Sequence, residues 1–161
     1  MEDRKSNLDI NTPEGQKSLK QESKMLNYIK KKWKVDIIET DKEDSASCDG
    51  FLVKKNIIKA VFESKCRNLT LNELENFGSW LITYKKLEEG AQLSKLLKVP
   101  FIGFLNLNYD DLTMYWKITN KEGNFLFNFK TEETITQKNI NGGKITRLNA
   151  FLPVSEGKFI I

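Results

Sequence analysis

The stretch that most constrains the fold is a short apolar run in the first half of the chain. Ile57–Phe62 reads IIKAVF, and its β-branched and aromatic side chains favour extended backbone. A run that is apolar at nearly every position is typical of a strand with neighbours on both sides. The sequence therefore predicts a central strand here, ending at the polar triplet Glu63-Ser64-Lys65.

The other expected elements have clear end signals. A helix is expected from Thr12-Pro13, an N-cap hydroxyl followed by proline, to about Lys32. Further elements are expected as strands over 35–39, 51–54, 101–107 and 112–118, a long helix over 71–98, and β ribbons over 125–129, 133–138 and 144–153 with a turn at 141–143. Gly90 is expected to divide the long helix. This order predicts an α/β (α+β) fold around a mixed central sheet, with a β-rich C-terminal extension.

The length of 161 residues suits one domain. We expect a polar, mobile N-terminal tail over 1–11 and a single domain over 12–161, with its core at about 12–118 and the extension at about 121–161. Apolar residues make up 39% and charged residues 30%, as in soluble globular proteins. No apolar N-terminal run indicates a signal peptide or a membrane span, so we expect a cytoplasmic protein, in a host cell if it is viral.

The chain has no histidine. This excludes hydrolases with a Ser-His-Asp or Cys-His set, HNH-type nucleases and almost every catalytic zinc site. The only cysteines, Cys48 and Cys66, form no CxxC motif and are expected to be buried free thiols. Any chemistry must then depend on carboxylates, lysines or hydroxyls. The net charge of +4 permits nucleic-acid binding without establishing it.

The strongest chemical pattern joins Asp49 to Glu63 and Lys65. Residues two apart in a strand share a face, so Glu63 and Lys65 should project together. A tight hairpin at Lys55-Asn56 would place the start of one strand, at Asp49, beside the end of the next, at Glu63. Two adjacent carboxylates repel, and a hard divalent cation relieves that repulsion. A neighbouring lysine can orient a water or stabilise charge on a phosphate.

With these residues and this order of elements, the sequence resembles the PD-(D/E)XK nuclease superfamily. That superfamily includes restriction endonucleases, Holliday-junction resolvases and phage-type nucleases. The resemblance covers about 12–118 and rests on Cys48-Asp49-Gly50-Phe51 and Ile57–Lys65, with Cys48 standing where the family name has proline. It implies a restriction-endonuclease-like fold and a Mg²⁺-dependent deoxyribonuclease, in which Mn²⁺ can substitute, acting as an endonuclease that leaves a 5′-phosphate and a 3′-hydroxyl.

The resemblance also implies roles for individual residues. Asp49, Glu63 and the backbone carbonyl of Ser64 would bind the metal, and Lys65 would be the catalytic lysine. Glu22, a carboxylate on the apolar stripe of the first helix, falls where the family often supplies a further acidic residue, acting on the metal through water. One polar residue of the helix after the motif, drawn from Tyr84, Lys85 and Gln92, is expected near the scissile phosphate.

Other interpretations of these residues remain open. Lys30, Lys31, Lys32 and Lys34 either bind phosphates or form a solvated helix end. Glu63 and Lys65 could be a surface ion pair, Asp49 a simple turn residue, and Glu22 a cap or the partner of a core lysine. The alternative function is a catalytically inactive nucleic-acid-binding or virion/assembly module on the same fold. DNA is the expected partner, with RNA and a homodimer left open, and no membrane contact is expected.

Overall fold

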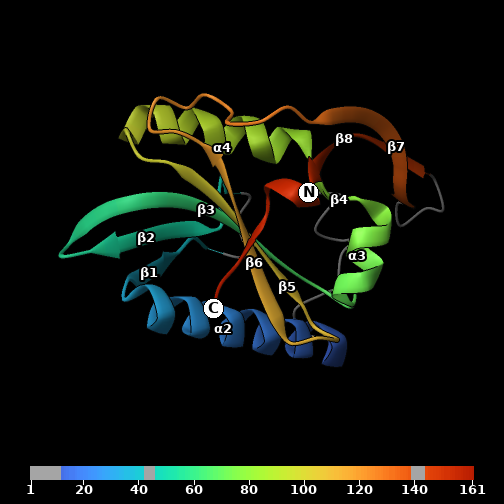
Figure 1. Cartoon of the computed structure of the whole chain (residues 1–161), viewed down its shortest axis with the longest axis horizontal. Coiled ribbons are helices and arrows are strands. Elements are labelled where there is room, and N and C mark those ends of the chain that lie inside the picture. The colour runs from blue at the N-terminus through green and yellow to red at the C-terminus, as the bar shows by residue number, and fades with distance from the viewer. Residues whose placement is uncertain (1–11, 42–45, 139–143) are drawn as a thin grey trace.

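A six-stranded mixed sheet forms the centre of the fold, with helices on both faces (Figure 1). The computed structural model describes residues 12–41, 46–138 and 144–161. The strands, in sheet order, are β1 (Asp36–Glu39), β2 (Gly50–Lys54), β3 (Ile57–Arg67), β5 (Phe101–Leu107), β6 (Leu112–Thr119) and β9 (Lys158–Phe159). β3 pairs antiparallel with β2 and parallel with β5. The predicted central strand and mixed α/β fold are therefore confirmed, although β3 continues past Lys65 to Arg67.

One face of this sheet is covered by α2 (Pro13–Trp33). As predicted, the Thr12 hydroxyl caps the helix by accepting the N–H of Gly15 at 3.0 Å, and Pro13 occupies the first turn. The helix ends at Lys34, whose backbone is left-handed with φ 54°. The apolar cluster between α2 and the sheet includes Met25, Leu26, Ile29, Phe62 and Phe104.

The prediction of one long helix over 71–98 is wrong. The chain instead forms α3 (Leu71–Phe77), β4 (Ser79–Thr83) and α4 (Tyr84–Leu97). Gly78 ends α3 in a left-handed conformation, with φ 81°, which glycine adopts without steric cost. β4 then pairs antiparallel with β8 (Lys144–Pro153), a partner far along the chain that helical periodicity cannot reveal.

Gly90 does not divide the helix in which it lies, because α4 continues through it to Leu97. A Cβ at this position would come within 2.3 Å of the Phe101 ring. The glycine therefore permits close packing of α4 on β5, on the sheet face opposite α2 (Figure 1). This packing places the first turn of α4 over the middle of β3.

The C-terminal part contributes a second sheet, ordered β4-β8-β7, with β7 at Lys130–Lys138. The ribbons expected over 133–138 and 144–153 lie within β7 and β8, while the turn expected at 141–143 and the tail at 1–11 lie outside the described residues. The prediction of a strand over 125–129 is wrong. Phe125 makes an isolated bridge to Thr119, and the rings of Phe127 and Phe129 pack on each other and on the core.

The core on the α4 face joins both sheets. Trp80 of β4 packs against Trp116 of β6, with ring centroids 5.0 Å apart. Ala150 and Leu152 of β8 are fully buried in the same cluster. In the part of the chain that the structure describes, no helix has the length and apolar character needed to span a membrane.

Candidate active site

The β2–β3 hairpin brings Asp49 and Glu63 together, as the sequence predicted. Gly50 pairs with Phe62 across the hairpin, and the Asp49 N–H donates to the Phe62 carbonyl at 3.0 Å. Asp49 therefore lies directly beside Glu63 at the start of β2. The Asp49 side chain is held by Ser64, whose backbone N–H donates to Oδ2 at 2.8 Å. One carboxylate thus has a fixed orientation next to the other.

Two neighbouring residues hold this corner in place. The Thr40 hydroxyl donates to the Cys48 carbonyl at 2.7 Å, and the Thr40 N–H donates to the Asp49 carbonyl at 2.9 Å. At Gly50, a Cβ would lie 2.4 Å from the Ile38 carbonyl oxygen. Thr40 and Gly50 therefore let β1 approach the Asp49 turn closely. Cys48, beside them, is a buried free thiol as expected, whereas Cys66 is only half-buried.

Glu63 has an unusual environment for a carboxylate. Its exposed fraction is 0%, and neither Oε1 nor Oε2 has a hydrogen-bond partner among the described residues. Burial, with the negative charge of Asp49 as the next cause, raises the pKa of Glu63 to about 8. An ionised carboxylate without hydrogen bonds is costly in a protein interior. This side chain therefore requires either a proton or a cation.

Two lysines approach Glu63 on the α4 side of the sheet. Lys65, two residues along β3, shares its face as predicted, and the positive charge of Lys65 opposes the rise in the pKa of Glu63. Lys86 reaches in from the first turn of α4, with Nζ 4.0 Å from Glu63 Oε1. The same Nζ donates to the Ala46 carbonyl at 3.1 Å, so Lys86 also links α4 to the segment preceding Asp49.

A comparison with protein-family models gives a match over most of the chain. The model described as "Phage putative PDDEXK endonuclease" matches residues 11–131. The chain belongs to this PD-(D/E)XK family. The matched region runs from α2 to the start of β7 and includes the hairpin, the central strand and α4. Comparisons with curated proteins and with solved structures found no match.

Members of PD-(D/E)XK families hold a divalent cation between acidic side chains, and the donor set here fits such an ion. Asp49 and Glu63 offer carboxylate oxygens, and Ser64 adds a backbone carbonyl, which are ligands suited to Mg²⁺. The buried, unpartnered oxygens of Glu63 are the observation that favours a cation. No group of three His, Cys, Asp or Glu side chains suited to a metal occurs in the described ranges.

The structure separates Glu22 from these residues. Burial raises the pKa of the Cys66 thiol to about 11, and the nearby charge of Glu22 is the next cause. Cys66 packs in the cluster beneath α2, whereas Glu63 contacts Lys86 on the α4 side. Glu22 thus lies by the opposite face of β3 from Glu63. Its role towards the metal, through water, remains a prediction.

None of the three polar residues expected near the site from the helix after the motif is the one that contacts Glu63 in the structure. Lys85 and Gln92 are exposed, and Tyr84 packs near Phe129 with ring centroids 6.3 Å apart. The structure brings Lys86 to Glu63 instead, a residue that the sequence analysis missed. Lys86 lies four residues before the buried Gly90 and so shares the inner face of α4. The spacing between Lys86 and Gly90 could be used as a signal only with the knowledge that the helix begins at Tyr84.

Proposed function

We propose that this PD-(D/E)XK family member is a Mg²⁺-dependent deoxyribonuclease that hydrolyses phosphodiester bonds internally, with Mn²⁺ able to replace Mg²⁺. The observation that supports this most strongly is Glu63, a fully buried carboxylate with no hydrogen-bond partner among the described residues, beside Asp49 and Lys65. The Lys86 ammonium lies 4.0 Å from Glu63 Oε1, at the outer limit of an ion pair. A structural ion pair would be closer and supported by hydrogen bonds.

The roles follow from the chemistry of each group. Asp49, Glu63 and the Ser64 carbonyl would hold the cation, which supplies an activated water and stabilises charge on the phosphate. Ser64 holds the Asp49 carboxylate through its N–H, so this proposed ligand is already oriented beside Glu63. Lys65 would orient the attacking water and, through its ammonium group, would hold the phosphate oxygen near the site.

The experiment compares nucleic-acid cleavage by wild type and three single variants. Plasmid, single-stranded and branched DNA, with RNA as a separate arm, are incubated in Mg²⁺, in Mn²⁺ and in EDTA. We expect wild-type cleavage in either metal and none in EDTA. Glu63→Ala, Asp49→Ala and Lys65→Ala should lose activity by about 10²-fold or more, the usual contribution of one acid–base group.

Glu75→Ala is the matched control, because Glu75 is an exposed carboxylate on α3. It should cleave like wild type. Equal cleavage by wild type, Glu63→Ala and Lys65→Ala would contradict the proposal, since the activity would then come from a contaminant or another site. No cleavage by wild type in either metal would favour the inactive nucleic-acid-binding module instead.

A further inference from the structure

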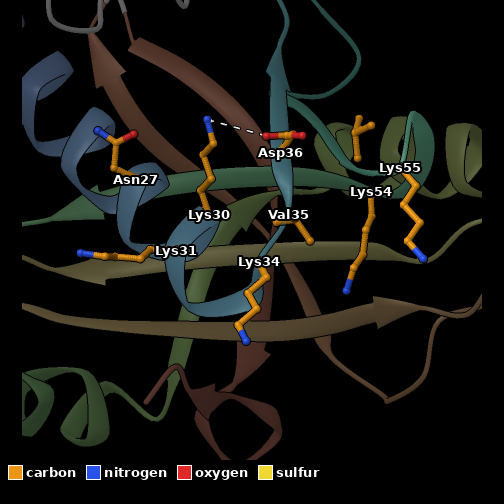
Figure 2. Close-up of a pocket in the computed structure, with 9 residues that line it drawn as sticks. Asn27, Lys30, Lys31, Lys34, Val35, Asp36, Lys54 and Lys55 are labelled. Carbon is orange, nitrogen blue, oxygen red and sulfur yellow. Dashed lines mark ion pairs between the residues drawn. The ribbon is translucent and has the colours of Figure 1, made fainter.

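A groove lined mainly by lysines lies at the end of the β2–β3 hairpin that is remote from Asp49. It has a volume of about 460 Å³ and is bounded by the C-terminal turn of α2, the start of β1 and the end of β2. Its lining consists of Asn27, Lys30, Lys31, Lys34, Val35, Asp36, Val53, Lys54 and Lys55. Figure 2 shows Lys34, Lys54 and Lys55 extending towards one side of it.

The charge of this groove is unbalanced. Five lysines line it with a single carboxylate, Asp36, which lies 3.8 Å from Lys30. Lys34, Lys54 and Lys55 are all exposed. Like charges gathered around one groove repel one another, and a polyanion would reduce the repulsion. The lining has no aromatic ring on which a base could stack and one side-chain amide, Asn27. These features suit phosphate groups better than base edges.

The backbone geometry places the groove on the same sheet edge as the catalytic corner. β1 is the edge strand, and along it Glu39 pairs with Gly50 while Asp36 pairs with Val53. Three strand residues, or about 10 Å, therefore separate the two ends. This distance corresponds to about three phosphates along one strand of a duplex. The groove lies on the α2 face of the sheet and the Glu63 carboxylate on the α4 face, so a nucleic acid that crosses the β1 edge could contact both.

From these observations we infer that the groove is a second contact site for the sugar-phosphate backbone of a nucleic acid, separate from the metal-binding carboxylates. The inference rests on the proposed function, because the bound polyanion is the nuclease substrate. The groove holds a flanking segment of the substrate and carries no sequence information. It therefore contributes affinity that falls steeply with salt.

The test measures binding without turnover. A fluorescein-labelled 30-base-pair duplex is titrated by anisotropy in EDTA between 50 and 200 mM salt, for wild type, for the triple variant Lys34→Gln/Lys54→Gln/Lys55→Gln and for Lys54→Gln alone. Each lost phosphate contact should make the slope of log affinity against log salt shallower by about 0.9. We therefore expect the slope to be shallower by two to three units for the triple variant and by about one unit for Lys54→Gln. The triple variant should also bind the duplex at least tenfold more weakly than wild type at 100 mM salt.

The matched control is Lys95→Gln/Lys121→Gln/Lys130→Gln, which removes the same charge from three exposed lysines elsewhere. Lys95 lies in α4, Lys121 in the turn that follows β6, and Lys130 in β7. It should change the slope by less than one unit. Equal effects of the two triple variants, or no binding of the duplex by wild type, would overturn the inference. The proposed function is tested separately from this inference. If wild type binds DNA through the groove but never cleaves it in Mg²⁺ or Mn²⁺, the proposed nuclease activity is refuted and the inferred role of the groove still stands.

Discussion

The pH dependence of metal-free stability should be dominated by Glu63. The pKa of this group is raised from 4.5 to about 8 in the folded protein, chiefly by burial and next by Asp49. Because the folded state retains a proton that the unfolded chain releases, stability is fully present below pH 4.5 and is lost as the pH rises to about 8. A shift of that size corresponds to about 5 kcal/mol, of which roughly 3–4 kcal/mol falls between pH 5 and pH 8.

Glu63→Gln isolates this contribution, because the amide keeps the shape of the side chain and cannot ionise. Urea denaturation in EDTA at pH 5, 6, 7 and 8 gives the free energy of unfolding of wild type and variant. The difference between them should change by roughly 3–4 kcal/mol in favour of the variant as the pH rises. The control Glu75→Gln, at an exposed position on α3, should follow wild type at every pH.

The same experiment with Mn²⁺ links the pKa of Glu63 to metal binding. A cation binds the ionised carboxylate and displaces its proton, so the stabilisation of wild type should be larger at pH 8 than at pH 6. Glu63→Gln should lose most of that stabilisation. Parallel pH profiles for wild type and Glu63→Gln in EDTA would refute the reasoning, since Glu63 would then titrate alike in the folded and unfolded chains.

Three further outcomes follow from the packing. Lys86→Gln removes a positive charge 4.0 Å from Glu63 Oε1, so the pKa of Glu63 in the folded protein should rise further. In the same urea series, the pH at which the loss of metal-free stability is complete should therefore increase by as much as about one unit, while its onset stays the same. Gly90→Ala places a Cβ 2.3 Å from the Phe101 ring and should cost about 1–3 kcal/mol in urea denaturation, whereas an unchanged midpoint would show that α4 can shift freely. Thr70→Ala breaks the capping box of α3 and should cost about 1 kcal/mol, with Thr70→Ser restoring most of it.

Local sequence was sufficient to predict that Asp49 lies beside Glu63, because a hairpin fixes its own register. Lys55 and Asn56 adopt positive φ values of 52° and 61°, which make the tight two-residue connection expected between β2 and β3. With that connection set, Asp49 must lie beside Glu63, and Lys65 must share the Glu63 face. The remaining expected site residues depended on more distant contacts. One unbroken helix was expected over 71–98, and its expected polar residues were Tyr84, Lys85 and Gln92. The residue that reaches Glu63 is Lys86, in the first turn of α4.

The sequence by itself determined features that depend on neighbours along the chain, namely the helix cap at Thr12, the apolar central strand and the pairing of Asp49 with Glu63. Tertiary structure decided what surrounds Glu63. α4 packs on that face of β3 and brings Lys86 to the Glu63 carboxylate, which is fully buried. Burial depends on segments far apart in sequence, and the raised pKa of Glu63 depends on burial. A carboxylate that could have been a solvated strand end thereby becomes a fully buried one with a raised pKa.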